Sequence, residues 1–382
     1  MNLTWAHEEL SGIELGDARL EKRAVTLLGE LGKKPGASIP MACGGWGETL
    51  AAYRFMGNEK CHWTDILAPH AACTQARMAE HPVVLCLQDT TELDFNGQQI
   101  EGLGPLNYEA QRGMLVHPTL AVTPERLQLG LLDSWMWTRE FKDQNGVRPG
   151  INESTRWIEG YERVAERALE LPQTRLVYVA DRESDLLALM QKANALDFAA
   201  DLLIRSKHNR VLAKGEDKLW DRVGATEPLG EIEFCLPGRK GKPARPVKQE
   251  LRVLRVTFNG GKTGTSFEMT ALLAREINAP VGEKPVEWRL LTNRNPKTVA
   301  EAAELVGWYC CRWEIEMFFN VLKNGCIVKG CNFQVSAALK RHWLSISLSP
   351  GGSGTCCGWD ALAPTWIVKP CLHARNGRPL GS

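Results

Sequence analysis

Two short apolar runs, set among helical segments, constrain the fold more than any other feature of this sequence. Val83–Leu87 and Leu176–Ala180 carry no charge, and an aspartate follows each run within two residues. Runs of this length and composition are typical of strands buried on both faces of a sheet. Helical periodicity over 159–171 and 185–195 alternates with them, so the pattern predicts an α/β domain with a mixed sheet.

The first 80 residues predict helices instead. Asp17 can cap a helix whose apolar side chains recur at helical spacing as far as Leu31, and two more helices are expected at 46–56 and 65–80. Basic residues lie along this first helix and just after it: Arg19, Lys22, Arg23, Lys33 and Lys34. A small helical module with one basic side is typical of DNA-binding domains, although an ordinary solvated helix face carries similar charges.

The region from about 211 to 285 has a third character. Strands are expected there at 231–236, 250–258 and 266–274, joined by turns rich in Gly, Pro and Lys, which predicts an antiparallel β insertion. Gly261-Lys262-Thr263 resembles the end of a phosphate-binding loop, but Val256 stands where that motif requires glycine. We therefore interpret this tripeptide as a hairpin turn.

Composition excludes several classes of protein. The chain has 46 Lys and Arg against 45 Asp and Glu, a net charge of +1, so it is neither a histone-like polycation nor an acidic tail protein. Its 12 cysteines include no Cys-x-x-Cys pair, which is typical of neither a zinc site nor a disulfide framework. With no apolar stretch of membrane-spanning length and no signal-peptide pattern, a cytoplasmic location is expected.

Acidic residues follow both apolar runs. Asp89 comes after the first run and Asp181 after the second. In α/β sheets, sites assemble outside the carboxyl ends of strands, so these two carboxylates can converge. A single aspartate at a strand end is more often a turn former or a helix cap.

A last strand is expected at 288–291, followed by a long helix that begins at the capping box Thr298–Glu301 and runs to about Lys323. On one continuous helix, four polar residues would share a stripe of roughly 60°: Tyr309, Arg312, Glu316 and Lys323. A salt-bridged solvent face is the alternative, but the rest of this helix is largely apolar, which favours a site. Carboxylates from two strands and one helix form the oxygen-rich set that binds paired divalent ions, and such ligands favour Mg²⁺ or Mn²⁺.

The same residues resemble those of a known family. Tyr309-x-x-Arg312-x-x-x-Glu316-x6-Lys323 is similar to the Tyr-Arg-Glu-Lys signature of the bacterial insertion-sequence IS-four family of DDE transposases. Asp181-Arg182-Glu183-Ser184-Asp185 resembles the second-aspartate motif of that family, and Leu87-Gln88-Asp89-Thr90-Thr91 resembles the first. The resemblance spans roughly residues 1–330 and is closest to the Tn-five transposase subgroup.

The resemblance implies a helical DNA-binding domain at 1–70 and a ribonuclease-H-like catalytic core at 71–330, which performs Mg²⁺-dependent cut-and-paste transposition. The family's metal ligands correspond to Asp89, Asp181 and Glu316. Its DNA-contacting positions correspond to Tyr309, Arg312, Lys323, Trp288, Arg205 and Lys33. The implied partners are double-stranded DNA at the transposon ends, target DNA and a second copy of the chain. Asn320 stands where the subgroup can have a further lysine.

Residues 331–382 differ from the rest of the chain. Of the 45 acidic residues only Asp360 lies here, and the segment contains the glycine-rich run 349–354 and shows no sustained periodicity. Codons compatible with 330–354 can, one base along, encode an amphipathic helix. We therefore interpret the segment as read out of frame, poorly packed and unable to form the family's dimer; a genuine, poorly structured tail is the alternative. A non-catalytic inhibitor that binds transposon ends and a structure-specific nuclease are the competing functions.

We predict that translating the gene one base along from about codon 330 yields an open reading frame that encodes a periodic helix. Sequencing the gene tests this directly. A shifted frame that soon meets a stop codon, or one without helical periodicity, would identify the tail as genuine.

Overall fold

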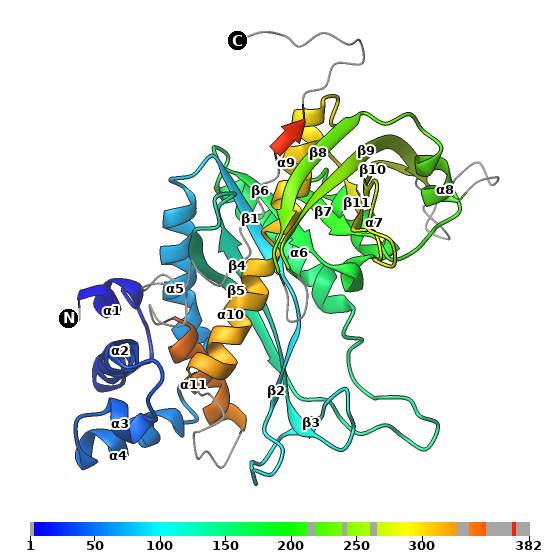
Figure 1. Cartoon of the computed structure of the whole chain (residues 1–382). Coiled ribbons are helices and arrows are strands. Elements are labelled where there is room, and N and C mark those ends of the chain that lie inside the picture. The colour runs from blue at the N-terminus through cyan, green and yellow to red at the C-terminus, as the bar shows by residue number, and fades with distance from the viewer. Residues whose placement is uncertain are drawn as a thin grey trace. The chain divides into compact units, whose positions relative to one another are not determined.

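The computed structural model describes residues 4–212, 218–238, 243–259, 266–326, 336–348 and 369–371. The chain divides into two compact units, which we describe separately (Figure 1). The first unit comprises Met1–Arg156 and Trp313–Asp360, and the second comprises Trp157–Arg312 and Ala361–Ser382. The domain limits expected from the sequence stay a prediction. Among the described residues, no helix is long and apolar enough to cross a membrane.

Helices open the first unit, as the sequence predicts. Their bounds are α1 Thr4–Glu9, α2 Ala18–Lys33, α3 Ile39–Ala42, α4 Trp46–Met56 and α5 Trp63–Met78. The Asp17 side chain caps α2 by accepting a hydrogen bond from the Arg19 backbone N–H at 2.8 Å. The apolar stripe of α2 is buried, so the amphipathic pattern places this helix against its neighbours α1 and α4.

A sheet built around one long strand follows. Its strands are β1 Val83–Gln88, β2 Thr91–Asp94, β3 Gly104–Pro105, β4 Arg112–Val122 and β5 Gln128–Trp137. β1, β2, β3 and β5 each pair antiparallel with β4. Every residue of β4 after Arg112 is buried, which explains its nearly unbroken apolar sequence. Helix α5 packs against β5.

A partly buried polar cluster fixes α1 and α5 to β5. The Arg77 guanidinium donates hydrogen bonds to the Leu129 carbonyl at 2.6 Å and to the Glu9 carboxylate at 3.1 Å. His70 contacts Glu9 through Nδ1, while its Nε2 accepts a hydrogen bond from the Leu131 backbone N–H at 2.9 Å. The helices are therefore held to the sheet by directional contacts as well as by apolar packing.

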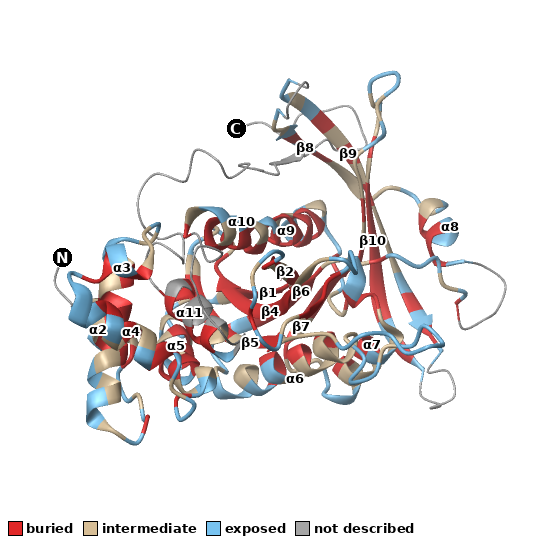
Figure 2. Cartoon of the chain, turned by 90° about the horizontal axis from the view of Figure 1, so that it is seen from below, coloured by how far each residue is buried: buried red, intermediate tan, exposed pale blue. Residues whose placement is uncertain are grey.

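The second unit contains the rest of the expected α/β pattern. Its elements are α6 Thr155–Glu170, which begins in the first unit, β6 Arg175–Ala180, the 3₁₀ turn η1 Arg182–Ser184, α7 Leu187–Ala195, β7 Asp201–Arg205, α8 Leu219–Gly224, β8 Gly230–Leu236, β9 Arg245–Phe258, β10 Phe267–Glu276, β11 Glu287–Thr292, α9 Val299–Cys310 and β12 Lys369–Cys371. Strands β6 and β7 are parallel, and α9 covers one face of them while α6 and α7 cover the other (Figure 2).

The sheet of this unit continues from β7 through β11, β10, β9 and β8 to β12, with every one of these pairs antiparallel. The predicted antiparallel insertion is thus confirmed as β8, β9 and β10. The tripeptide 261–263, interpreted as a hairpin turn, lies outside the described residues. Together the two units confirm an α/β fold with a helical N-terminal region and a largely antiparallel sheet.

The single long helix expected from Thr298 to Lys323 is wrong. The chain forms α9, then α10 Trp313–Asn320, and then a π-helical turn η3 Val321–Gly325. At the break, the Arg312 N–H bonds to the Tyr309 carbonyl three residues back, at 3.1 Å. Such three-residue bonding tightens the chain and interrupts the α-helical hydrogen-bond pattern at 311–312.

The tail also differs from expectation. Helix α11 Ser336–Ser347 lies within it and packs against α2, α4 and α5. The Arg341 side chain is buried and donates to the carbonyls of Met56 at 2.6 Å and Cys61 at 2.8 Å, which lie at and beyond the end of α4. The expectation of a poorly packed tail is therefore wrong for 336–348, because this guanidinium satisfies backbone groups that a helix end leaves without partners.

We predict that Glu9→Gln lowers the free energy of unfolding at pH 7 by about 1–3 kcal/mol. Burial alone would raise the pKa of Glu9, but hydrogen bonds from His70 and Arg77 outweigh it and lower the pKa to about 2. Because the folded pKa lies below the unfolded value of 4.5, the carboxylate stabilises the fold above about pH 5, and this contribution is lost as the pH falls toward 2.

Urea denaturation between pH 7 and pH 3 measures this effect. The variant should lose part of the acid sensitivity of the native chain. Glu14→Gln, at an exposed position nearby, is the matched control. It should change neither the free energy of unfolding at pH 7 nor its dependence on pH. Equal stability of native and Glu9→Gln chains at pH 7 would contradict the assignment.

Candidate functional site

Four of the predicted site residues meet at the end of β6 in the second unit. Asp181 follows this strand directly, and the Tyr309 hydroxyl at the end of α9 donates a hydrogen bond to its Oδ1 at 3.0 Å. Arg205 Nη1, at the end of β7, lies 3.9 Å from Asp181 Oδ1, and Arg312 Nη2 lies 3.9 Å from Oδ2. Parallel pairing of β6 and β7 places the ends of both strands at the same edge, which brings Asp181 and Arg205 together.

The charges in this cluster are unequal, because two guanidinium groups face one carboxylate. The Arg312 side chain is 5% exposed and the Asp181 side chain 31% exposed, so the carboxylate stays open to solvent. Burial, reinforced by the negative charge of Asp181, raises the pKa of Tyr309 well above its ordinary value, and the phenol remains a donor at neutral pH. The cluster can thus orient a carboxylate and attract an anion such as a phosphate.

Asp89 lies half-buried after β1 in the first unit, between two anchored neighbours. The Thr90 hydroxyl lies 2.8 Å from His117 Nδ1, and His117 Nε2 lies 3.2 Å from Gln88 Oε1. Because the Gln88 amide group donates to Thr119 at 2.6 Å, its oxygen faces His117, so His117 Nε2 donates and Nδ1 accepts from Thr90.

Burial, with the charge of Arg156 adding to it, lowers the pKa of His117 to about 3, so the ring is neutral. Sequence reasoning missed this residue. Its only sequence signal is an imidazole in the middle of the largely apolar strand β4.

Glu316 and Lys323 belong to the same unit as Asp89. Glu316 lies half-buried on α10, and Lys323 lies half-buried in η3. Helix α10 is held by a buried ion pair, in which Arg126 Nη1 of the β4–β5 hairpin donates to Glu314 Oε1 at 2.7 Å. The sequence contains no local signal for this pair, because its members are 188 residues apart.

The remaining predicted DNA contacts lie elsewhere in their units. Trp288 on β11 is 8% exposed and stacks on Phe234, with ring centroids 5.5 Å apart, so the structure accounts for it as a core residue. Lys33 at the end of α2 pairs with Glu30 at 2.8 Å. Base stacking by Trp288 and DNA contact by Lys33 stay predictions.

The basic side of α2 is partly neutralised within the chain. Arg19 pairs with Asp17 at 2.8 Å, and Arg23 pairs with Glu48 of α4. Lys22 is exposed on the same helix. The positive charge expected on this side is therefore smaller than the sequence suggests.

The three metal ligands predicted from the sequence are carboxylates of both units. Asp89 and Glu316 belong to the first unit and Asp181 to the second. Across the described parts of the chain, no group of three or more His, Cys, Asp or Glu side chains is close enough to hold a metal ion. Ligation by these three carboxylates stays a prediction, as does the choice of Mg²⁺.

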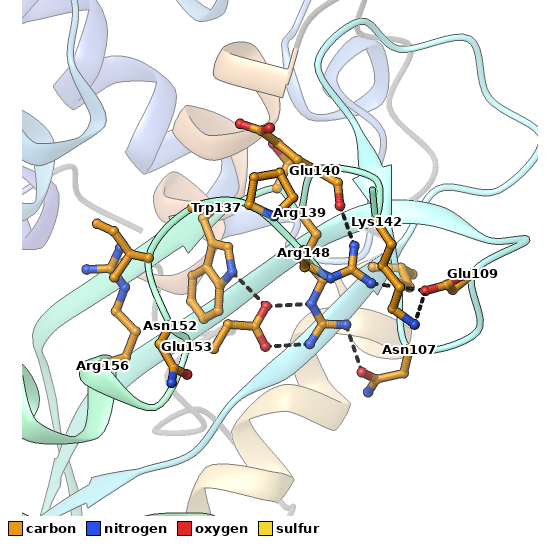
Figure 3. Close-up of a pocket in the computed structure, with 15 residues that line it drawn as sticks. Asn107, Glu109, Trp137, Arg139, Glu140, Lys142, Arg148, Asn152, Glu153 and Arg156 are labelled. Atoms are coloured by element: carbon orange, nitrogen blue, oxygen red, sulfur yellow. Dashed lines mark hydrogen bonds and ion pairs between the residues drawn. The ribbon is translucent and has the colours of Figure 1, made fainter. Parts of the chain in front are cut away.

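The first unit also contains a charged cavity of about 680 Å³ beneath the segment 138–153 (Figure 3). Figure 3 shows acidic or polar partners for three of its cations: Arg139 binds Glu153 and Asn107, while Lys142 and Arg148 share Glu109. The fourth, Arg156, lies over the rings of Trp135 and Trp137. Because these charges compensate one another, the cavity is a weaker candidate for an anion site than the Asp181 cluster.

We predict that Tyr309→Phe costs less stability than Tyr178→Phe. Both hydroxyls donate one hydrogen bond of 3.0 Å, to Asp181 and to the Trp157 carbonyl respectively. Water can take the place of the Tyr309 hydroxyl at the partly exposed Asp181. The buried Trp157 carbonyl keeps its bond within α6 but loses the Tyr178 hydroxyl without a water to replace it, at about 0.5–1.5 kcal/mol. Thermal and urea denaturation measure both variants, and an equal or larger loss for Tyr309→Phe would contradict an open Asp181.

Comparison with known proteins gives a family match and a structural match. Residues 2–61, which contain α1 to α4, match the family model described as transposase DNA-binding. A solved structure, the piggyBac transposase synaptic complex with hairpin DNA, is similar at 10% sequence identity and a TM-score of 0.25, covering 79% of this chain. This chain spans 58% of that structure's chain. The family match supports a DNA transposase in general and places a DNA-binding segment at the N-terminal helices.

Proposed function

We propose that this protein is a DDE transposase of the bacterial insertion-sequence IS-four family, of the Tn-five subgroup, with a ribonuclease-H-like core. In this proposal it excises an insertion sequence by Mg²⁺-dependent cut-and-paste chemistry and joins the ends to target DNA. Two independent features support it: the Tyr-Arg-Glu-Lys pattern of the sequence, and the match of residues 2–61 to a transposase DNA-binding model.

The observation that carries the proposal is the Asp181 cluster. Its members, Asp181, Arg205, Tyr309 and Arg312, span more than 130 positions of the sequence, and the family resemblance predicts all four for one DNA-processing site. Their side chains lie within 3.0–3.9 Å of one carboxylate. An ordinary surface ion pair does not require a buried tyrosine donor and two cations around one acid.

The residues of this cluster have distinct roles in the proposed reaction. Tyr309 orients the Asp181 carboxylate by donating to Oδ1. Arg205 and Arg312 are placed to bind the phosphate whose ester bond is cut, since a guanidinium matches phosphate geometry. In the first unit, Asp89 is fixed through its neighbours, and Glu316 lies on a helix braced by Glu314.

Asp89, Asp181 and Glu316 would hold the divalent metal, and their oxygen donors fit Mg²⁺, with Mn²⁺ as a substitute. When bound, the metal supplies positive charge that stabilises the attacking and leaving oxygens of an in-line displacement. Lys323 would add a cation for the phosphate beside it.

The proposed partners are double-stranded DNA at the transposon ends and target DNA, within the bacterial cytoplasm and nucleoid. A homodimer that pairs two ends is impaired in this proposal, because the tail departs from the family pattern. Two alternatives share the same N-terminal segment: a non-catalytic inhibitor that occupies transposon ends, and a structure-specific nuclease.

A gel assay with the ends of the element that encodes the protein separates these functions. Binding, nicking and strand transfer are measured with and without Mg²⁺. All three activities in Mg²⁺ support a transposase. Binding without nicking identifies an inhibitor, and nicking without strand transfer identifies a nuclease or a copy impaired at the joining step.

We predict that Asp89→Ala, Asp181→Ala and Glu316→Ala each abolish DNA cleavage but leave DNA binding within about threefold of the native chain. Each variant removes a proposed metal ligand and no phosphate-binding cation. Cleavage of end DNA and its affinity are measured in parallel. Near-normal Mg²⁺-dependent nicking by any one of them would remove that residue from the site.

We predict that DNA binding weakens steeply with salt despite the net charge of +1. Basic side chains at the N-terminal helices and beside β7 would release counterions from several phosphates. These cations are Arg19, Lys22, Arg23, Lys33, Lys34, Arg205 and Lys207, whereas the neighbouring Arg210 is paired with Asp185. Dissociation constants between about 50 and 200 mM salt test this, and a flat response would contradict a phosphate-dominated interface.

A further inference from the structure

The loop that follows β7, residues 206–210, combines exposed side chains with a firmly held backbone. Lys207, His208 and Asn209 are exposed, whereas Ser206 is buried. The loop begins next to Arg205, which faces Asp181 in the proposed site. Exposed basic loops are usually mobile, so the contacts that fix this one require an explanation.

One buried carboxylate holds the loop from below. Asp185 has a fully buried side chain, and its Oδ2 accepts hydrogen bonds from the backbone N–H of Lys207 at 2.6 Å, the N–H of His208 at 2.8 Å and the Ser206 hydroxyl at 3.2 Å. Arg210 closes the loop, with Nη1 2.5 Å from Asp185 Oδ1 and Nη2 donating to the Asp185 carbonyl at 2.6 Å.

Helix α8 holds the same loop from the other side. The Trp220 indole N–H lies 3.2 Å from both the His208 carbonyl and the Ser206 hydroxyl oxygen. The Trp220 backbone N–H donates to the Asn209 side chain at 2.8 Å, and the Leu219 N–H donates to the Arg210 carbonyl at 2.8 Å. The loop is thus clamped between Asp185 and α8.

These contacts divide the basic residues of the loop into two kinds. The Arg210 guanidinium binds Asp185, at both the carboxylate and the backbone carbonyl. The exposed Lys207 side chain projects from a backbone that Asp185 already fixes. A cation held in this way loses less conformational entropy when it meets an anion than one on a mobile loop.

We propose that Asp185 is a positioning residue that shapes loop 206–210, so that Lys207, two residues after Arg205, meets a DNA phosphate. Arg210 acts as a clasp in this arrangement and makes no contact with DNA. The proposal rests on the proposed function, since it assumes that the second unit binds the DNA backbone.

The test is a double-mutant cycle of Asp185→Asn and Lys207→Met in the full chain. The probe is a duplex oligonucleotide that carries the end of the element, and affinity is measured from about 50 to 200 mM salt. Lys207→Met should weaken binding roughly five- to tenfold at 0.1 M salt and reduce the slope of log K against log[salt] by about 0.9. Asp185→Asn should give the same change in slope, and the double variant no further change.

Glu276→Gln is the matched control. This carboxylate of β10 is also buried against an arginine, Arg245, and accepts the Val286 N–H at 2.8 Å. Its substitution should lower stability but leave the salt slope unchanged.

Native affinity and slope in Asp185→Asn would overturn the proposal while leaving the proposed function intact, and so would effects of Asp185→Asn and Lys207→Met that simply add. Failure of the native chain to bind end DNA would instead overturn the proposed function as well.

Two further measurements keep the test decisive if Asp185→Asn does not fold. Ser206→Ala removes one donor to Asp185 and leaves the charge of Asp185 unchanged. This variant should reduce the slope of log K against log[salt], but by less than Asp185→Asn does. In the native chain, the amide hydrogens of Lys207 and His208 should exchange slowly although both residues are exposed. Fast exchange at both amides would show that Asp185 does not hold the loop.

Discussion

The burial of strands β1, β4 and β6 determines where polar side chains can lie in this protein. From their second residues onward these strands are buried, so a charged side chain placed within them would be costly unless paired. Polar groups therefore collect where the strands end. Asp89 and Asp181 occupy such ends, and in the second unit the parallel neighbour β7 brings Arg205 to the same edge as Asp181.

Several polar groups inside each unit have specific partners, and each holds a segment that carries or adjoins a predicted site residue. His117 fixes the residues on both sides of Asp89, and Arg126 fixes the helix that carries Glu316 through Glu314. Asp185 fixes the loop after Arg205. Buried hydrogen bonds of this type hold a backbone more rigidly than apolar packing, because each donor left without its acceptor costs free energy. Rigid positioning is what a site for phosphate chemistry requires.

Charge pairing within the chain limits the number of cations that this nearly neutral protein has left for an anionic partner. Arg23, Arg139 and Arg210 are each occupied by an acidic residue of their own unit. Such pairs remove cations from the surface without changing the net charge. The positive charge that remains for an anionic partner lies where cations outnumber the acids beside them. The clearest case is Asp181, whose one carboxylate is shared by Arg205 and Arg312.

The sequence by itself determined the local structure of this protein. Helix α2 with its Asp17 cap, strands β1, β6 and β7, and the antiparallel insertion follow from periodicity and capping, which act between near neighbours in the chain. The tertiary structure alone decided the packing of Arg341 under α4 and the partners of Glu314 and Asp185. These depend on contacts between residues as far as 285 positions apart, where burial and hydrogen-bond satisfaction outweigh the local preferences that a sequence pattern records.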